Sequence, residues 1–89
     1  MIERTLGIIN KLGLHARAAA KLVQTANGFR SEITVGRDGK QVNAKSIMGV
    51  MMLAAARGTE ITVRANGPDE DQAVAALTEL VKSKFGEPE

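Results

Sequence analysis

The 89-residue chain contains no cysteine, tryptophan or tyrosine, and its only aromatic residues are two phenylalanines. The lack of cysteine excludes a disulfide-stabilised scaffold and every zinc site built on thiolates. So few aromatic side chains argue against a surface on which bases stack, and we expect no nucleic-acid partner. With a single histidine and no thiol, we expect neither a metal site nor a cofactor.

Long hydrophobic runs are missing as well. The longest mainly apolar stretch without a charged residue covers only 46–56, far short of the roughly 20 residues that span a bilayer. The first residues also lack the apolar core of a signal peptide, so we expect a cytoplasmic protein without a membrane span. The composition that is present, 44% hydrophobic and 25% charged, predicts one globular domain over residues 1–89.

The charges are unevenly distributed although the net charge is only +2. Residues 1–58 carry nine basic and three acidic side chains, whereas residues 59–89 carry three basic and seven acidic ones. Ordinary solvated faces would explain this pattern. The sharper interpretation is a basic surface that binds acidic or phosphorylated partners. A free-standing nucleic-acid binder would suit the isoelectric point near 9.3, but the aromatic content disfavours it.

Hydrophobic periodicity predicts seven elements in the order β-α-β-β-α-β-α. The expected strands lie at 2–8, 31–36, 41–43 and 60–65, and the expected helices lie at 16–26, from 47 to near Gly58, and 70–85. Each helix has one apolar stripe and each strand one apolar face. We therefore predict an α+β fold, an open-faced β-sandwich with all three helices on one side of a single sheet.

Four local signals refine this prediction. Gly28 follows the first helix and is expected to end it in a left-handed conformation. The Asp-Gly pair at 38–39 predicts a tight hairpin between the second and third strands. Asp69 and Gln72 have the spacing of a capping box at the start of the last helix. The tail 86–89 is expected to fray.

His15 is the only histidine, and it lies between a glycine-containing loop and the first predicted helix. The amides of Ala16, Arg17 and Ala18 would be unpaired donors of the first turn, and such amides attract anions. The guanidinium of Arg17 can also bind phosphate oxygens in a bidentate manner. A neutral imidazole can accept a phosphoryl group in line, and the labile N–P bond suits a carrier that passes the group on.

A bland alternative is that His15 is a polar residue at a helix start and carries no chemistry. On the residues alone, this alternative is the better supported for a lone histidine in such a place. A Ser-His-acid triad has no support, because nothing in the sequence locates an acid beside His15. The acidic cluster 69–71 is explained by the favourable interaction of carboxylates with a helix N-terminus.

The motif Gly-Leu-His-Ala-Arg at 13–17, followed by Ala-Ala-Lys at 19–21, strongly resembles the active-site signature of HPr. HPr is the histidine-containing phosphocarrier of the bacterial phosphoenolpyruvate-dependent phosphotransferase system. The block 42–50 resembles the regulatory serine motif of that family, and 58–63 matches a third stretch. The resemblance covers essentially the whole chain and implies a four-stranded antiparallel sheet with three helices on one face.

The resemblance implies a phosphocarrier and not an enzyme. Enzyme I would phosphorylate His15, on Nδ1 in this family and with the help of Arg17, and His15 would pass the group to IIA domains in sugar transport and its regulation. The common signature has proline where this chain has Ala18, and the run 15–20 resembles the nitrogen-related branch. A nitrogen-type regulatory relay that acts by phosphorylation-dependent binding is therefore the alternative. A purely regulatory binding module is disfavoured by His15, and we expect a monomer.

Ser46 stands where the N-cap of the second helix is expected, and capping alone would explain it. The resemblance adds regulatory phosphorylation of Ser46 by an HPr kinase/phosphorylase. It also implies that Ile47, Met48 and Met51 lie at partner interfaces, where the adaptable methionine side chain suits several partners. The alternative is that every methionine packs in the core.

Overall fold

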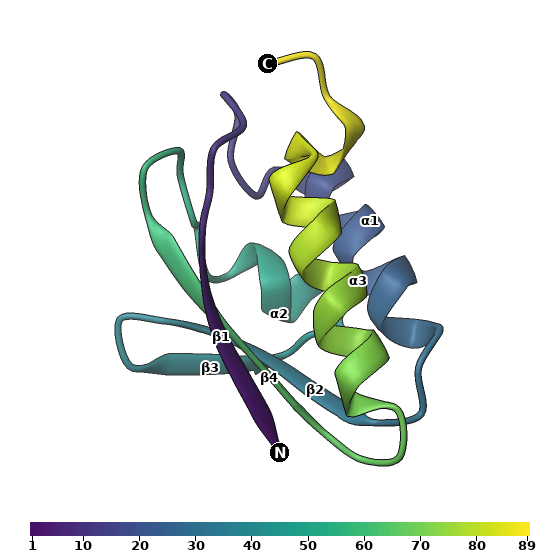
Figure 1. The fold of residues 1–89 in the computed structure, drawn as a ribbon. Helices are drawn as coiled ribbons and strands as arrows, with labels where there is room; N and C mark the ends of the chain where they lie inside the picture. The colour runs from purple at the N-terminus through teal and green to yellow at the C-terminus, as the bar shows by residue number, and fades with distance from the viewer.

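The computed structural model describes residues 1–89 as one antiparallel sheet with three α-helices on one of its faces (Figure 1). The element order agrees with the prediction. The elements are β1 (Ile2–Gly7), α1 (Ala16–Asn27), β2 (Glu32–Arg37), β3 (Lys40–Asn43), α2 (Ile47–Met51), β4 (Glu60–Asn66) and α3 (Glu70–Lys82), followed by a 3-10 turn at Lys84–Gly86. The predicted open-faced sandwich is confirmed.

The four strands are ordered β1-β4-β2-β3, and every neighbouring pair is antiparallel. In this register Val63 of the inner strand β4 lies between Arg4 of β1 and Val35 of β2. The predicted hairpin joins β2 to the short edge strand β3. Its two turn residues, Asp38 and Gly39, have φ values of 52° and 81°, as a type I′ turn requires.

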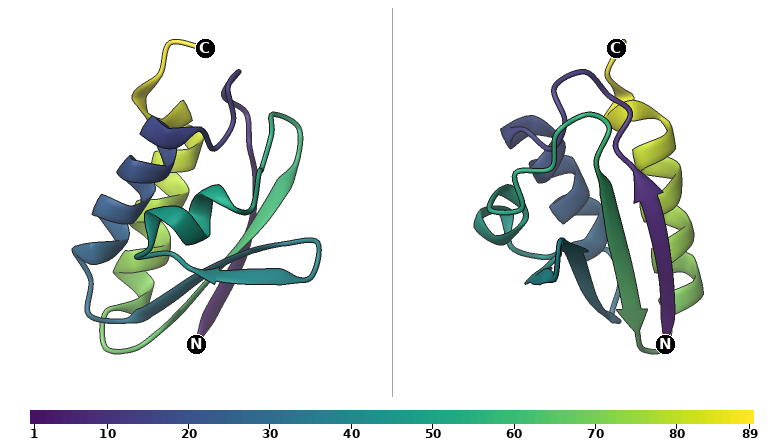
Figure 2. Two further views of the ribbon diagram at one scale, coloured as in Figure 1. Left: turned by 180° about the vertical axis from the view of Figure 1, so that it is seen from behind. Right: turned by 90° about the vertical axis from the view of Figure 1, so that its left-hand side faces the viewer.

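The core lies between the sheet and the helices, and the other face of the sheet is free of helices (Figure 2). Strand β4 alternates as predicted: its odd-numbered residues are buried beneath the helices, and its even-numbered ones lie on the open side. Helix α1 contributes small as well as large apolar side chains to the core. Its buried residues are Ala18, Ala19, Leu22, Val23 and Ala26. This packing fixes α1, and with it the position of its N-terminus.

The ends of the first two helices differ from the predictions. Gly28 has a φ of −74°, so α1 does not end in a left-handed glycine. Helix α2 ends at Met51, well before Gly58, because Ala54 adopts a left-handed conformation with a φ of 50°. The guanidinium of Arg37 donates to main-chain carbonyls of this turn, including that of Ala54 at 3.2 Å, which holds the chain in its non-helical course.

The predicted capping box at the start of α3 is wrong. The side chain of Asp69 makes no hydrogen bond to its own helix and turns instead toward the segment that precedes β2. There its two oxygens accept hydrogen bonds from the amides of Arg30 and Ser31, both at 2.9 Å, and from the Ser31 hydroxyl at 2.5 Å. Three donors from another part of the chain outcompete one amide of the helix.

The expectation of a frayed tail is wrong as well. Helix α3 ends at Lys82, and both Lys84 and Phe85 then adopt left-handed conformations, with φ values of 59° and 56°. The ring of Phe85 is completely buried in the core. The chain thereby turns back, and the residues after α3 lie beside the start of α1 (Figures 1 and 2).

Candidate functional site

The loop before α1 determines where the backbone of His15 lies. Leu14 is buried, and its amide donates to the carbonyl of Ala55 at 2.9 Å. Gly13 has a φ of 65°, and a Cβ there would lie 2.5 Å from the same carbonyl oxygen, so only glycine fits without a shift. His15 therefore follows a segment held tightly against the chain after α2.

His15 is itself the N-cap of α1. Its Nδ1 accepts a hydrogen bond from the Arg17 amide at 3.2 Å, and its carbonyl accepts one from Ala19 at 2.8 Å. The prediction of three free first-turn amides therefore needs correction. The amide of Arg17 is bound to the ring, Ala18 is fully buried, and Ala16 is exposed. The structure does bring the imidazole to the mouth of the helix, with 27% of the side chain exposed.

The other ring nitrogen of His15 contacts a carboxylate that sequence reasoning missed. Nε2 is hydrogen-bonded to Oε2 of Glu87, whose side chain is only 13% exposed. The second oxygen, Oε1, accepts from the side-chain amide of Asn10 at 2.9 Å. Asn10 is completely buried, and its amide also donates to the carbonyl of Gly13 at 2.9 Å. Asn10, Glu87 and His15 thus form a chain of hydrogen bonds beneath the candidate reactive atom.

These contacts keep Glu87 ionised. The hydrogen bond from Asn10 lowers the pKa of the Glu87 carboxyl below its ordinary value, and the hydrogen bond and charge of His15 act in the same direction. The positive charge of Lys21 contributes as well, and partial desolvation opposes these effects without cancelling them. Glu87 therefore brings a negative charge to the ring at neutral pH.

The tail that carries Glu87 is bound at both of its ends. On one side, the ammonium group of Lys21 in α1 donates to the carbonyl of Phe85 at 2.6 Å. On the other side, the amide of Lys11 donates to a main-chain oxygen of Glu89 at 3.0 Å. The tail is thus fixed both to α1 and to the loop that precedes it.

A surface pocket of about 620 Å³ opens beside the imidazole. Around His15 it is lined by Lys11, Leu12, Ala16 and Arg17, and the tail residues 87–89 complete it. Arg17 is exposed, and its guanidinium makes no ion pair with a carboxylate. An anion that enters this pocket would meet the unpaired guanidinium of Arg17 and the start of α1, which favour negative charge, whereas the carboxylates of Glu87 and Glu89 in the same lining oppose it.

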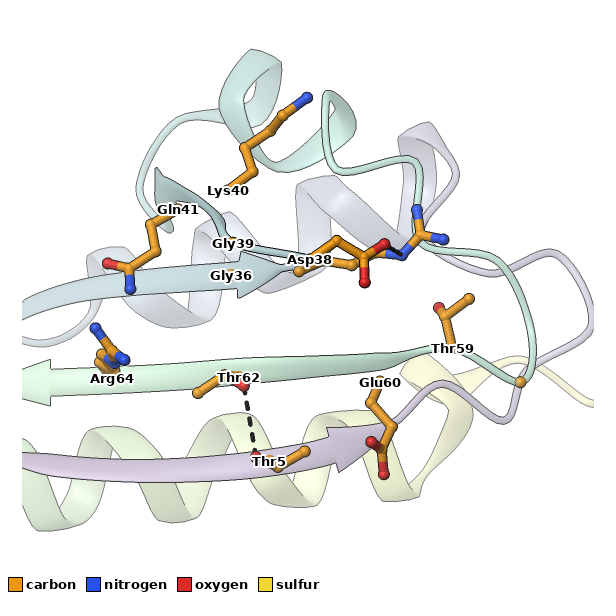
Figure 3. Close-up of a pocket in the computed structure, with 12 residues that line it drawn as sticks. Thr5, Gly36, Asp38, Gly39, Lys40, Gln41, Thr59, Glu60, Thr62 and Arg64 are labelled. Atoms are coloured by element: carbon orange, nitrogen blue, oxygen red, sulfur yellow. Dashed lines mark hydrogen bonds and ion pairs between the residues drawn. The ribbon is translucent and has the colours of Figure 1, made fainter.

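A larger pocket, of about 700 Å³, lies over the open face of the sheet and the β2–β3 hairpin (Figure 3). Its lining is polar throughout, with Thr5 and Thr62 joined by a hydrogen bond of 3.5 Å between their hydroxyls. It contains no histidine and none of the candidate residues. The pocket beside His15 is therefore the better candidate.

No group of three or more histidine or acidic side chains that could hold a metal ion occurs in the structure.

Ser46 caps α2 as predicted, since its hydroxyl accepts the amide of Gly49 at 3.2 Å. No hydrogen bond or ion pair links it to His15, although α1 packs against α2. The alternative that every methionine packs in the core is wrong. Four large apolar side chains in and just after α2 are exposed, namely Ile47, Met48, Met51 and Met52. We call these four residues the α2 patch.

Sequence reasoning found His15 and Arg17 but missed Asn10 and Glu87. Asn10 lies between the first predicted strand and the first predicted helix, where no site residue is expected, and Glu87 lies in the tail that is expected to fray. The signal that could have revealed the tail is Phe85, a large apolar residue just after the charged end of α3. Burial of that ring requires the following residues to lie against the domain.

The chain resembles known proteins over its whole length. Residues 2–83 match the family model described as "PTS HPr component phosphorylation site". The chain is 56% identical over 89 residues to the phosphocarrier protein HPr of Cupriavidus necator, covering 100% of both chains. It is 58% identical over 87 residues to the HPr of Xylella fastidiosa, covering 98% of each.

Solved structures agree with these relatives. A crystal structure of HPr-C-His from Thermoanaerobacter tengcongensis superposes with a TM-score of 0.96 at 53% identity and covers 100% of both chains. A crystal structure of an HPr dimer from the same organism has a TM-score of 0.79 at 54% identity, with 98% of this chain and 100% of that chain covered. None of the three α-helices described here combines the length and hydropathy that crossing a bilayer requires.

Proposed function

Because the chain belongs to the HPr family of phosphocarrier proteins, we propose that it carries the phosphoryl group on Nδ1 of His15. The donor is enzyme I, charged from phosphoenolpyruvate, and the acceptors are IIA domains. The observation that carries this proposal is the partly exposed imidazole at the N-terminus of α1, beside a pocket whose lining includes the exposed side chain of Arg17. The relay operates in the cytoplasm, where phosphoenolpyruvate is made, and the working form is the monomer.

The transfer follows from the hydrogen bonds of the ring. The lone pair of Nδ1 attacks the phosphorus atom, and the bond from phosphorus to the donor breaks with its electron pair leaving on the donor. Nδ1 then no longer accepts the Arg17 amide, which becomes free to donate to a phosphoryl oxygen. The Arg17 guanidinium stabilises the charge that develops on the other oxygens. Transfer to the acceptor reverses these steps.

The α2 patch supports a docking role beside this site. Its exposed Ile47, Met48 and Met51 offer an adaptable apolar surface on the helix that packs against α1. A phosphate on Ser46, added by an HPr kinase/phosphorylase, would introduce a charge of about −2 next to this patch. Such a modification would weaken apolar docking while the start of α2 accommodates the negative charge.

Reconstitution with purified enzyme I and phosphoenolpyruvate tests the carrier role. We expect the unchanged protein to gain one acid-labile phosphate, measured by intact-mass spectrometry, and the His15→Ala variant to gain none. Arg17→Glu should slow the transfer roughly 10²-fold while the circular dichroism spectrum stays the same. Labelling of His15→Ala at the normal rate would refute the assignment.

The same reconstituted system separates the two candidate pathways. The phosphorylated protein is mixed with purified sugar-type and nitrogen-type IIA domains, and the rate of phosphate transfer to each is compared. Faster transfer to the sugar-type domain is the result that we expect. Faster transfer to the nitrogen-type domain would favour the regulatory relay suggested by Ala18.

A further inference from the structure

We propose that Glu87 is a positioning residue for His15. Its carboxylate holds the proton on Nε2 of the imidazole and stabilises the positively charged ring that forms when Nδ1 is phosphorylated. This inference deepens the proposed function and rests on it. It concerns a side chain 72 positions away in the sequence, in a segment that the signature motif does not include.

The two partners of the ring require the same tautomer. A carboxylate can only accept a hydrogen bond, so the nitrogen that faces Glu87, Nε2, must carry the proton. A main-chain amide can only donate, so the nitrogen that faces Arg17, Nδ1, must present its lone pair. The neutral ring is therefore held with its nucleophilic atom at the mouth of α1 and its proton on the opposite side.

The position of Glu87 is built into the fold. Its Oε1 is bound by Asn10, which is completely buried, and its Oε2 is thereby directed at the ring. The tail turns back because Lys84 and Phe85 both adopt left-handed conformations. This conformation is unfavourable for residues other than glycine. The buried Phe85 ring holds this unfavourable turn in place.

The chemistry explains why a carboxylate is useful there. When the Nδ1–phosphorus bond forms, the ring keeps its Nε2 proton and becomes positively charged. Glu87 stabilises that charge and so disfavours loss of the proton. In the next transfer the Nδ1–phosphorus electron pair returns to the ring, which leaves as neutral imidazole with the proton still on Nε2. A ring that had lost this proton would leave as an anion, which is a much poorer leaving group.

Other charged groups also surround the ring, and one of them, Glu89, provides a control for the loss of a negative charge. Lys11 and Arg17 line the same pocket. The positive charge of Lys21 lowers the pKa of Glu87, and Glu89 is the second acidic residue of the tail. The side chain of Glu89 is 71% exposed and pairs only with Lys11, at 3.5 Å. Glu89→Gln therefore removes one negative charge from the tail without touching the ring, whereas Glu87→Gln removes the charge that touches it.

The rate of spontaneous hydrolysis of the phosphorylated protein, measured against pH, tests the inference. Hydrolysis is fast while the ring keeps its Nε2 proton and slows when that proton is lost. We expect Glu87→Gln to move the midpoint of this profile to lower pH by about one unit, so that hydrolysis above neutral pH slows severalfold. Glu89→Gln should move the midpoint much less, because Glu89 lines the pocket but does not contact the ring.

Proton NMR of the unphosphorylated variants provides a reading that needs no phosphate. The Nε2 proton should resonate downfield in the unchanged protein and in Glu89→Gln, and move upfield in Glu87→Gln. If both variants keep the resonance and the hydrolysis midpoint of the unchanged protein, the positioning role is refuted. If the unchanged protein accepts no phosphate at all, the proposed carrier function fails, while the NMR comparison still decides whether Glu87 holds the ring.

Discussion

At the scale of single residues, His15 serves both as a structural cap and as the proposed reactive group. Its Nδ1 satisfies the Arg17 amide, a donor that would otherwise lack a partner in the first turn of α1. Phosphorylation of Nδ1 must break this bond, and a phosphoryl oxygen can replace the acceptor that is lost. The Arg17 amide therefore has a hydrogen-bond acceptor in both the unphosphorylated and the phosphorylated protein. The backbone need not rearrange during transfer.

Gly13 sets the course of the backbone that leads to His15, so the variant Gly13→Ala should destabilise the protein. An alanine in a left-handed conformation costs about 1–2 kcal/mol, and the close approach to Ala55 adds about 1–3 kcal/mol. We expect the free energy of unfolding in urea to fall by about 2–5 kcal/mol. Gly7→Ala is the control, because a Cβ at Gly7 meets nothing within 4 Å. Equal stability of the two variants would contradict this prediction.

At the scale of elements, α2 is too short to be stable by itself. It has five residues, and Val50 is the only one of them that is buried. Helices of this length are unfavourable in water, so the cap and the neighbouring chain must supply its stability. A helix that contributes so little to the core can leave its apolar side chains exposed, which is how the α2 patch arises.

The cap of α2 can be tested directly at Ser46. Replacing it by alanine removes the acceptor of the Gly49 amide and should lower the free energy of unfolding by about 1 kcal/mol. Ser46→Asp keeps an acceptor and should restore most of this loss. Urea denaturation measures the stability, and hydrogen exchange at Gly49 reports on the helix itself. If the alanine variant is as stable as the aspartate variant, the hydroxyl does not cap α2.

At the scale of the whole molecule, a few long-range polar contacts join segments that the sheet does not connect. Asp69 ties the start of α3 to the segment before β2, across 38 residues of sequence. Glu87 ties the tail to the start of α1. Both carboxylates accept hydrogen bonds from main-chain or side-chain donors on distant segments. These hydrogen bonds stabilise the ionised form of each carboxyl group.

The contact of Asp69 predicts a specific loss of stability in acid. The Ser31 hydroxyl, followed by the Arg30 amide, lowers the pKa of Asp69 from 3.8 to about 2. Because the folded value lies below the unfolded one, its contribution is present above pH 4 and is lost as the pH falls toward 2. Asp69→Asn should therefore flatten the decline in melting temperature over this range.

A control for this experiment is available in the same turn of α3. Asp71→Asn removes an exposed carboxylate that has no hydrogen-bond partner, and it should leave the acid dependence as steep as before. Calorimetry between about pH 2 and pH 5 measures both variants. If Asp69→Asn declines as steeply as Asp71→Asn, the lowered pKa of Asp69 does not contribute to the stability of the fold.

The sequence by itself determined the features that depend on near neighbours. The alternation at 60–65 set the two faces of β4, the Asp-Gly pair at 38–39 made the hairpin, and His15 came at the start of a helix as its motif implied. Such patterns recur with the period of a strand or of a helix, so a short stretch of sequence is enough to reveal them. The capping role of Ser46 belongs to the same class.

Only the tertiary structure decided which distant polar groups meet. Nothing near Glu87 in the sequence points to His15, and nothing near Asp69 points to Ser31. Their contacts arise because burial of Phe85 turns the tail back, and because the packing of α3 brings its first turn to the segment before β2. A polar side chain takes the donors that packing brings to it, so its partner depends on the path of the whole chain.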